Sequence, residues 1–190
     1  MDILKDREIR KNKVIIFTSD HGDFLGDFAI WDKRYFYENV VGVPLIISGP
    51  GIPAEERFNA ARLSKALISN IDLYATIMNL SGMNIDGLRK RPGYNILEML
   101  REKRGVFRNE VFADLATSVM IRTGNWKLVF DPQQGGVQYF FNLAIDPREE
   151  NNLAGVRGYE SITLELIQKV LSYRILKTQF THIKEEQRIQ

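Results

Sequence analysis

A carboxylate and an imidazole stand side by side where an apolar run of this chain ends. Asp20 and His21 lie just after the apolar residues 14–17, and Lys33 follows in the same polar segment. An aspartate can bind a hard cation through oxygen, and a neutral imidazole can bind a metal through nitrogen or donate to an anionic oxygen. An Asp-His pair also fits a plain turn, and a lone lysine fits a surface charge. The surrounding elements must therefore decide between these readings.

Two apolar segments predict the strands that would position these residues. The first predicted strand covers residues 13–17. After Lys13 it is continuously apolar and rich in β-branched side chains, which predicts burial on both faces of a parallel or mixed sheet. Residues 43–48 predict a second strand, which the following Gly-Pro-Gly ends. Ligands gather outside the carboxyl ends of strands in open α/β sheets, and Asp20 lies at such an end.

The rest of the chain predicts helices first and then a strand-rich part. Residues 2–11 and 94–103 favour short helices, and a helix capped by Ser69 with Asp72 three places on should end at Gly82. A change to short alternating segments predicts an antiparallel meander, and a long amphipathic helix should follow it. The four predicted strands cover residues 110–113, 118–122, 126–131 and 138–142, and the helix carries Ile162, Leu166, Val170 and Leu171.

Composition excludes several classes of function. The net charge of +2, from 26 basic and 24 acidic residues, gives no basic face for nucleic acid. The absence of cysteine excludes disulfides, zinc-thiolate sites and a cysteine nucleophile within these 190 residues. No apolar stretch reaches the ~20 residues of a membrane span. The charged residues 1–8 do not resemble a signal peptide, and the compartment stays open.

The order of several motifs, taken together, closely resembles the C-terminal part of the sulfatase family, within the alkaline-phosphatase-like superfamily. The first motifs are Thr-Ser-Asp-His-Gly-Asp at 18–23, Trp-Asp-Lys at 31–33 and Val-Pro-Leu-Ile at 43–46. Further matches lie at residues 70–77, 120–129 and 141–153. The resemblance implies an α/β fold: the C-terminal part of an alkaline-phosphatase-like sheet with helices over residues 1–106. A small antiparallel four-stranded sheet with a packing C-terminal helix would follow over residues 107–190.

The resemblance also implies roles for the residues of the first motifs. Asp20 and His21 match two metal ligands, and Lys33 matches the lysine that contacts the sulfate or phosphate oxygens. The family site holds a divalent metal, expected to be calcium, magnesium or manganese. The substrate of the parent enzyme would be a sulfate ester, either a small molecule or a glycan. Positive charge near the ester oxygens agrees with the physical needs of such a reaction.

The sequence departs from the family at two places. The family nucleophile lies in Cys/Ser-x-Pro-x-Arg, whereas the nearest match here, starting at Ser48, ends in Ile52 and falls at the turn after a strand. Relatives carry Gly-Asp-His-Gly where residues 26–29 read Gly-Asp-Phe-Ala, so Phe28 replaces a histidine. We therefore expect weak or absent metal binding by this chain alone, and no turnover without a partner that carries the nucleophile.

Three further hypotheses stay open. The same residues would serve a phosphonate or phosphate ester hydrolase, and a non-catalytic remnant or assembly module would explain the missing nucleophile. Unpaired apolar strand edges favour a homo-oligomer or a complex with a complementary N-terminal polypeptide.

Arg122 and Lys127 fit surface charges of paired strands better than contacts with an anionic substrate. The segment at 146–149 fits a structural turn better than an acid–base pair.

Overall fold

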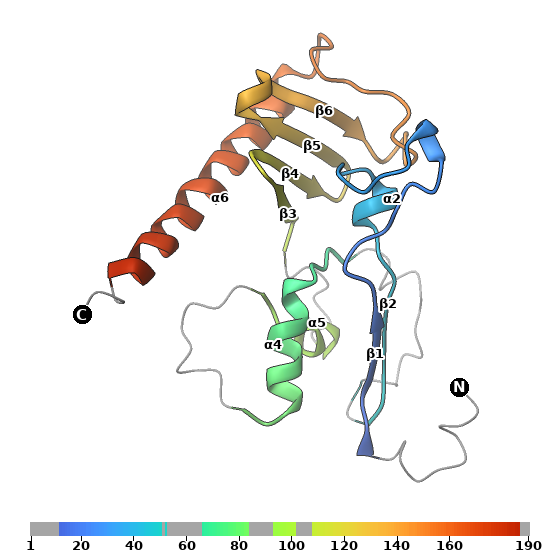
Figure 1. The fold of residues 1–190 in the computed structure, drawn as a ribbon, viewed down its shortest axis with the longest axis vertical. Helices are drawn as coiled ribbons and strands as arrows, with labels where there is room; N and C mark the ends of the chain where they lie inside the picture. Colours follow the sequence, from blue (N-terminus) through green and yellow to red (C-terminus); the bar gives the residue numbers. More distant parts are fainter. Residues whose placement is uncertain (1–11, 51, 53–65, 84–92, 102–107, 187–190) are drawn as a thin grey trace. The chain divides into compact units, whose positions relative to one another are not determined.

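The chain forms two compact units, Met1–Asn109 and Glu110–Gln190 (Figure 1). The computed structural model describes residues 12–50, 52, 66–83, 93–101 and 108–186. The helix expected over residues 2–11 lies outside this described part. The domain border expected between residues 106 and 107 stays a prediction, because residues 102–107 also lie outside it.

The N-terminal unit is built on a two-stranded antiparallel ribbon. Strand β1 (Ile15–Thr18) pairs with β2 (Leu45–Ser48), so that Ile16 lies opposite Ile47 and Phe17 opposite Ile46. Neighbouring residues of a strand point to opposite faces. Ile47 is buried, whereas Phe17 and Ile46 are 58% and 52% exposed. The expectation of a strand buried on both faces is therefore wrong for β1 within the described residues, because only one face of the ribbon is covered.

Two helices cover the inner face of this ribbon. Helix α4 (Ile71–Leu80) and helix α5 (Ile96–Arg101) lie side by side in the N-terminal unit (Figure 1). The expected helix start and the stop at Gly82 agree with α4 to within two residues, and α5 begins two residues after the expected start at Tyr94. The core of the unit consists of Ile47, Ile52, Ile96 and Leu97, packed against Val14, Ile16, Leu45, Ile68, Leu73 and Leu80.

A buried aspartate fixes the start of α4. Asp72 is fully buried, and its two oxygens accept hydrogen bonds from the backbone amides of Ser69 and Tyr94, both at 2.8 Å. The Arg108 guanidinium pairs with the same carboxylate. The structure places Asn70 rather than the expected Ser69 at the N-cap, although the Ser69 amide does bond to Asp72. Three segments of the unit meet at this one side chain.

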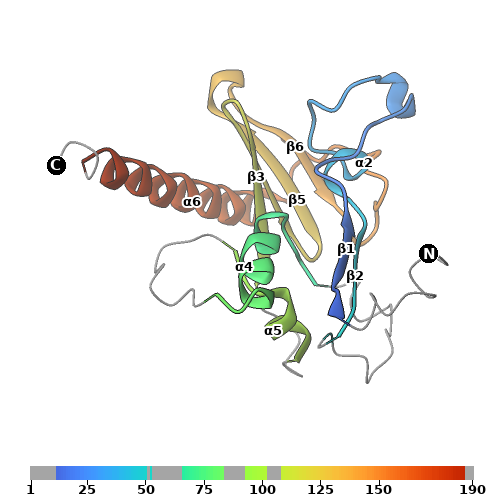
Figure 2. The same cartoon turned by 60° about the horizontal axis from the view of Figure 1, so that its bottom comes forward.

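The C-terminal unit is the expected meander with its packing helix. Its strands are β3 (Glu110–Leu115), β4 (Ser118–Thr123), β5 (Trp126–Asp131) and β6 (Gly136–Asn142), each antiparallel to the next. Helix α6 (Glu160–Glu186) lies along one face of this sheet (Figure 2). The core between them contains Val119, Ile121, Leu128, Phe140, Leu166 and Val170. Neither α6 nor any other helix in the described ranges combines the length and apolarity needed to span a membrane.

One carboxylate ties α6 to the edge strand β3. Asp114 accepts a hydrogen bond from the Tyr173 hydroxyl at 2.6 Å and pairs with Lys177 at 2.9 Å and Arg174 at 3.3 Å. Burial raises the pKa of Asp114, but these donors outweigh it and hold that pKa below its usual value. Burial and the bond to Asp114 raise the pKa of the Tyr173 phenol. The contact therefore keeps both groups in the protonation states that bind each other at neutral pH.

A buried ion pair lies on strand β5. The Lys127 ammonium is 2.6 Å from Oε1 of Glu149, and each side chain is only 1% exposed. Lys127 was expected to carry a surface charge, and this expectation is wrong. Glu149 belongs to the turn after β6, where Asp146 accepts hydrogen bonds from the amides of Glu150 and Asn151. The turn therefore places the Glu149 carboxylate against Lys127, a contact that the sequence of β5 alone does not predict.

Candidate functional site

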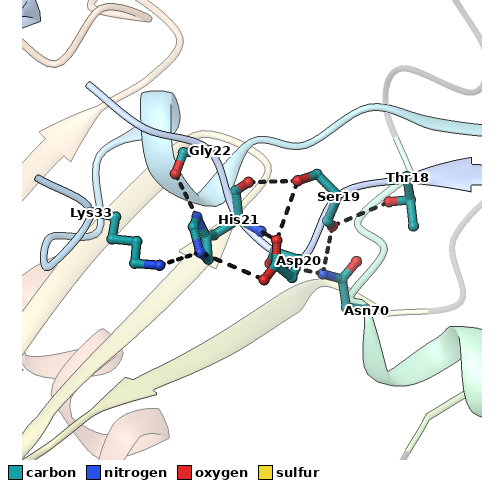
Figure 3. A network of polar contacts seen from close by, with 7 residues as sticks. All are labelled: Thr18, Ser19, Asp20, His21, Gly22, Lys33 and Asn70. Atoms are coloured by element: carbon teal, nitrogen blue, oxygen red, sulfur yellow. Dashed lines mark hydrogen bonds and ion pairs between the residues drawn. The ribbon is translucent and has the colours of Figure 1, made fainter. Parts of the chain in front are cut away.

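The loop that leaves β1 holds Asp20 and His21 in one tight turn (Figure 3). The backbone amide of His21 donates to Oδ1 of Asp20 at 3.0 Å, and the Ser19 hydroxyl donates to the carbonyl oxygen of His21 at 2.7 Å. Short polar side chains bond to nearby backbone in this way and fix turns. The turn directs both functional side chains to the same side of the loop (Figure 3).

The His21 ring joins the three residues that the sequence singled out. Its Nδ1 lies 2.7 Å from the carbonyl oxygen of Gly22, its Nε2 lies 2.8 Å from the Lys33 ammonium, and Oδ2 of Asp20 is 3.6 Å from Nε2. Because a carbonyl only accepts and an ammonium only donates, a proton on Nδ1 and a lone pair at Nε2 account for both contacts. Asp20, His21 and Lys33 therefore come together at one nitrogen (Figure 3).

A closed loop returns Lys33 to His21. The Gly22 amide donates to the carbonyl oxygen of Val40 at 2.7 Å, which closes residues 22–40 at their base. Phe24 is buried inside, with the rings of Tyr35 and Tyr37 at 5.8 and 5.5 Å from its own. Helix α2 (Glu38–Val41) ends the loop. The loop is thus packed on its own side chains, and this packing determines where Lys33 lies.

Backbone strain is concentrated in the same loop. Leu25, Phe28 and Ala29 have φ angles of 51°, 53° and 57°, a region that non-glycine residues rarely adopt. Phe28 lies in the short 3₁₀ helix η2 (Asp27–Ala29) and packs its ring 5.0 Å from that of Tyr37. The residue that replaces the family histidine thus belongs to the aromatic packing of the loop. Strain of this kind persists only where the surroundings enforce it, and it is frequent at functional sites.

The charges of the site are arranged around an exposed carboxylate. The side chain of Asp20 is 84% exposed, and the hydrogen bond from the His21 backbone amide lowers its pKa. Asp32 accepts a hydrogen bond from the Arg34 guanidinium at 2.7 Å, which lowers the pKa of Asp32. Both carboxylates are therefore ionised at neutral pH, and Arg34 is occupied by Asp32 while Lys33 contacts His21.

An asparagine from α4 also belongs to the site, and sequence reasoning missed it. Nδ2 of Asn70 donates to the carbonyl oxygens of Ser19 and Asp20, both at 3.1 Å (Figure 3). The sequence places Asn70 in a helix start and in the matched segment 70–77. Its place between a cap serine and the buried Asp72 gave no sign that its amide would bond to a loop fifty residues earlier in the chain.

Asp20 and His21 fit one side of a divalent-cation site. With the proton on Nδ1, Nε2 keeps a lone pair, which accepts from Lys33 here and could bind a cation only if the Lys33 ammonium moved aside. The ionised Asp20 oxygen nearby is the ligand that hard cations prefer. Such cations take about six or more ligands. Across the described residues, no group of three or more histidine, cysteine, aspartate or glutamate side chains is placed to hold a metal. The remaining ligands would have to come from elsewhere.

The only near match to the family's serine motif lies far from these residues. Ser48 is the last residue of β2 and pairs with Ile15, whereas Thr18, beside the site, pairs with Leu45. Three residues of strand place Ser48 about 10 Å along the ribbon from the site end. This position agrees with the rejection of Ser48 as the nucleophile.

Comparisons with known proteins point to one family. The family described as N-sulphoglucosamine sulphohydrolase, C-terminal, matches residues 26–175. The choline-sulfatase of Rhizobium meliloti is 35% identical over 165 residues, which cover 81% of this chain and 29% of that protein. The chain thus spans about a third of the length of the curated relatives it matches.

Solved structures agree with this result. A protein solved in complex with its substrate D-glucosamine-2-N,6-O-disulfate matches with a TM-score of 0.70 and 25% identity, over 91% of this chain and 36% of its own. The phosphonate monoester hydrolase of Agrobacterium radiobacter matches with a TM-score of 0.68 and 25% identity, over 92% of this chain and 37% of its own.

Proposed function

This chain belongs to the sulfatase family and corresponds to the C-terminal part of its members, and from this premise we propose that Asp20, His21 and Lys33 form one side of a metal-assisted site for sulfuric ester hydrolysis. The observation that carries the proposal is the meeting of Lys33 and Asp20 at Nε2 of His21. One cationic group and two metal donors are thereby held within a single loop segment.

Each of the three side chains has a distinct role in this proposal. Asp20 and His21 would hold a divalent cation, either calcium, magnesium or manganese, through a carboxylate oxygen and Nε2. Such a cation polarises the oxygens of the ester and lowers the pKa of an attacking group. Lys33 provides an ammonium group where negative charge develops on the sulfate and on the leaving oxygen. The Gly22 carbonyl keeps the proton of His21 on Nδ1, so that the Nε2 lone pair would turn from the Lys33 ammonium to the cation.

The nucleophile and the remaining ligands would come from polypeptide outside these 190 residues. The chain contains no cysteine, and its one near match to the serine motif is incomplete. The outward Phe17 and Ile46, together with the exposed Ile71 and Ile77 of α4, support an association with a complementary polypeptide or with a second copy. Native mass spectrometry distinguishes these two forms of assembly.

Manganese binding to the chain tests the metal half of this proposal. In ¹⁵N–¹H NMR spectra, we expect millimolar Mn²⁺ to broaden the amides of Ser19, Asp20 and His21 first, because Mn²⁺ relaxes nearby nuclei. The Asp20→Asn variant should need about tenfold more Mn²⁺ for the same broadening, because it loses the charged ligand. Asp23→Asn is the matched control, since that carboxylate caps the amide of Leu25 instead. Equal broadening in the Asp20→Asn variant would contradict the proposal.

A second candidate activity is the hydrolysis of phosphonate or phosphate esters. The structural likeness to a phosphonate monoester hydrolase favours it, and the three side chains suit either anion. A chimaera in which this chain replaces the matching part of choline-sulfatase can be assayed with p-nitrophenyl sulfate and with an aryl phosphonate ester. The higher kcat/KM identifies the preferred anion. A folded chimaera without either activity would favour the non-catalytic alternative.

A further inference from the structure

The Asn70 side chain forms hydrogen bonds that are unusual for a residue at a helix N-cap. Asn70 is the N-cap residue of α4, and an asparagine there normally accepts a hydrogen bond from an amide of the first helical turn. No side-chain cap bond forms at this helix start. Instead, its amide group donates to the carbonyl oxygens of Ser19 and Asp20. Since an amide nitrogen carries two hydrogens, these two bonds use its full donor capacity.

The two accepted bonds fix the backbone on both sides of Asp20. The carbonyl of Ser19 belongs to the peptide before Asp20, and the carbonyl of Asp20 belongs to the peptide before His21. Holding both peptide planes sets the directions in which the Asp20 and His21 side chains leave the backbone. The contacts of Nε2 with Oδ2 of Asp20 and with the Lys33 ammonium depend on those directions.

Asn70 can hold these two peptides because hydrogen bonds and an ion pair of the following residues fix the start of α4. Asp72, two residues later, is fully buried and accepts from the amides of Ser69 and Tyr94 while it pairs with Arg108. In addition, the Thr76 hydroxyl accepts a hydrogen bond from the amide of Ile96 at 3.0 Å. The start of α4 is therefore a rigid support rather than a frayed helix end.

We propose that Asn70 is a positioning residue, which sets the geometry of Asp20 and His21 from the N-terminus of α4. Asn70 contacts the backbone of the site loop and neither the ester nor the cation. The inference rests on the proposed function, since it assigns Asn70 to the same metal-assisted site. It predicts that loss of the Asn70 side-chain amide changes the geometry of Asp20 and His21 even where the helix cap is preserved.

The variant Asn70→Ser separates the two roles. Serine is also a preferred N-cap residue, but its short side chain cannot reach both carbonyls. We expect an unchanged melting temperature, a changed pattern of His21 ring ¹⁵N shifts, and about tenfold weaker Mn²⁺ broadening at Asp20 and His21. Asn79→Ser, at an exposed position of the same helix, is the matched control and should change none of these.

The outcomes separate this inference from the proposed function. His21 ring shifts and Mn²⁺ broadening that equal those of the unmodified chain would overturn the role of Asn70. Absence of Mn²⁺ broadening at Asp20 both in the unmodified chain and in the chimaera with choline-sulfatase would overturn the proposed metal site, while the ring shifts still report on Asn70. If Asn70→Ser also lowers the melting temperature, Asn70→Gln decides. Recovery of the ring shifts by the restored amide supports the positioning role, and failure to recover them refutes it.

Discussion

Replacement of Lys127 by methionine is expected to lower the free energy of unfolding of the C-terminal unit by about 3–5 kcal/mol. The methionine side chain fills a similar volume but removes the ammonium that lies 2.6 Å from the Glu149 carboxylate. Both side chains are 1% exposed, so water cannot replace the lost charge. Urea unfolding followed by Trp126 fluorescence, in a Trp31→Phe background, measures the effect, because Trp126 lies on β5 of the same unit.

The same unit offers a matched control for this prediction. Lys169 lies 2.8 Å from Glu110, but those side chains are 33% and 29% exposed. Lys169→Met should therefore cost less than about 1 kcal/mol. Replacing both Lys127 and Glu149 by methionine should recover most of the loss, because the charge that needs a partner is then absent. A Lys127→Met variant as stable as Lys169→Met would show that the buried pair contributes nothing to stability.

Lys127 also shows where reasoning from the sequence fails. The strand around it could be predicted, because residues 126–131 are rich in aromatic and aliphatic side chains and turn signals flank them. The burial of its ammonium could not, because its partner Glu149 is brought in by a turn after the next strand. Glu149 itself adopts φ of 59°, a conformation that no local propensity favours. A pairing that depends on two elements and an irregular backbone leaves no periodic pattern in the sequence.

Only part of the candidate site could be predicted from the sequence, because some of its contacts also join distant segments. Asp20 and His21 are adjacent in the sequence, so a single strand end brings them together. The approach of Lys33 was expected only from the resemblance to sulfatases, since the aromatic packing around Phe24 that returns it to His21 has no simple period. Asn70 was missed because its bonds join a helix start to a distant loop. Local chemistry is visible in the sequence, whereas contacts made by loop packing are not.

The strand β1 illustrates the opposite error. The run 14–17, which covers most of β1, is wholly apolar and predicted burial on both faces, yet Phe17 faces outward within the described residues. An apolar strand needs covering on both faces, but its sequence does not say which polypeptide supplies that cover. The exposed Phe17 and Ile46 therefore support the proposed association with further polypeptide, which supplies the cover that the pattern calls for.

Replacement of Gly22 by alanine is expected to open the site loop and to destabilise the N-terminal unit by about 3 kcal/mol, the upper end of the range for overpacking. A Cβ at this position would overlap the carbonyl oxygen of Asn39 and lie 3.0 Å from its carbonyl carbon and 3.4 Å from Cα of Val40. Backbone atoms cannot move aside as a flexible side chain can. The base of the loop, where the Gly22 amide bonds to Val40, must separate.

Separation at Gly22 moves Lys33 away from His21, because the closed loop is what brings the lysine back to the ring. The variant should therefore lose the His21 ring shifts of the unmodified chain and its Mn²⁺ broadening at Asp20. Gly124→Ala is the control, since a Cβ there meets no atom within 4 Å. Unchanged ring shifts in Gly22→Ala would mean that Lys33 reaches His21 without closure at Gly22, and that the packing of residues 22–40 does not determine the geometry of the site.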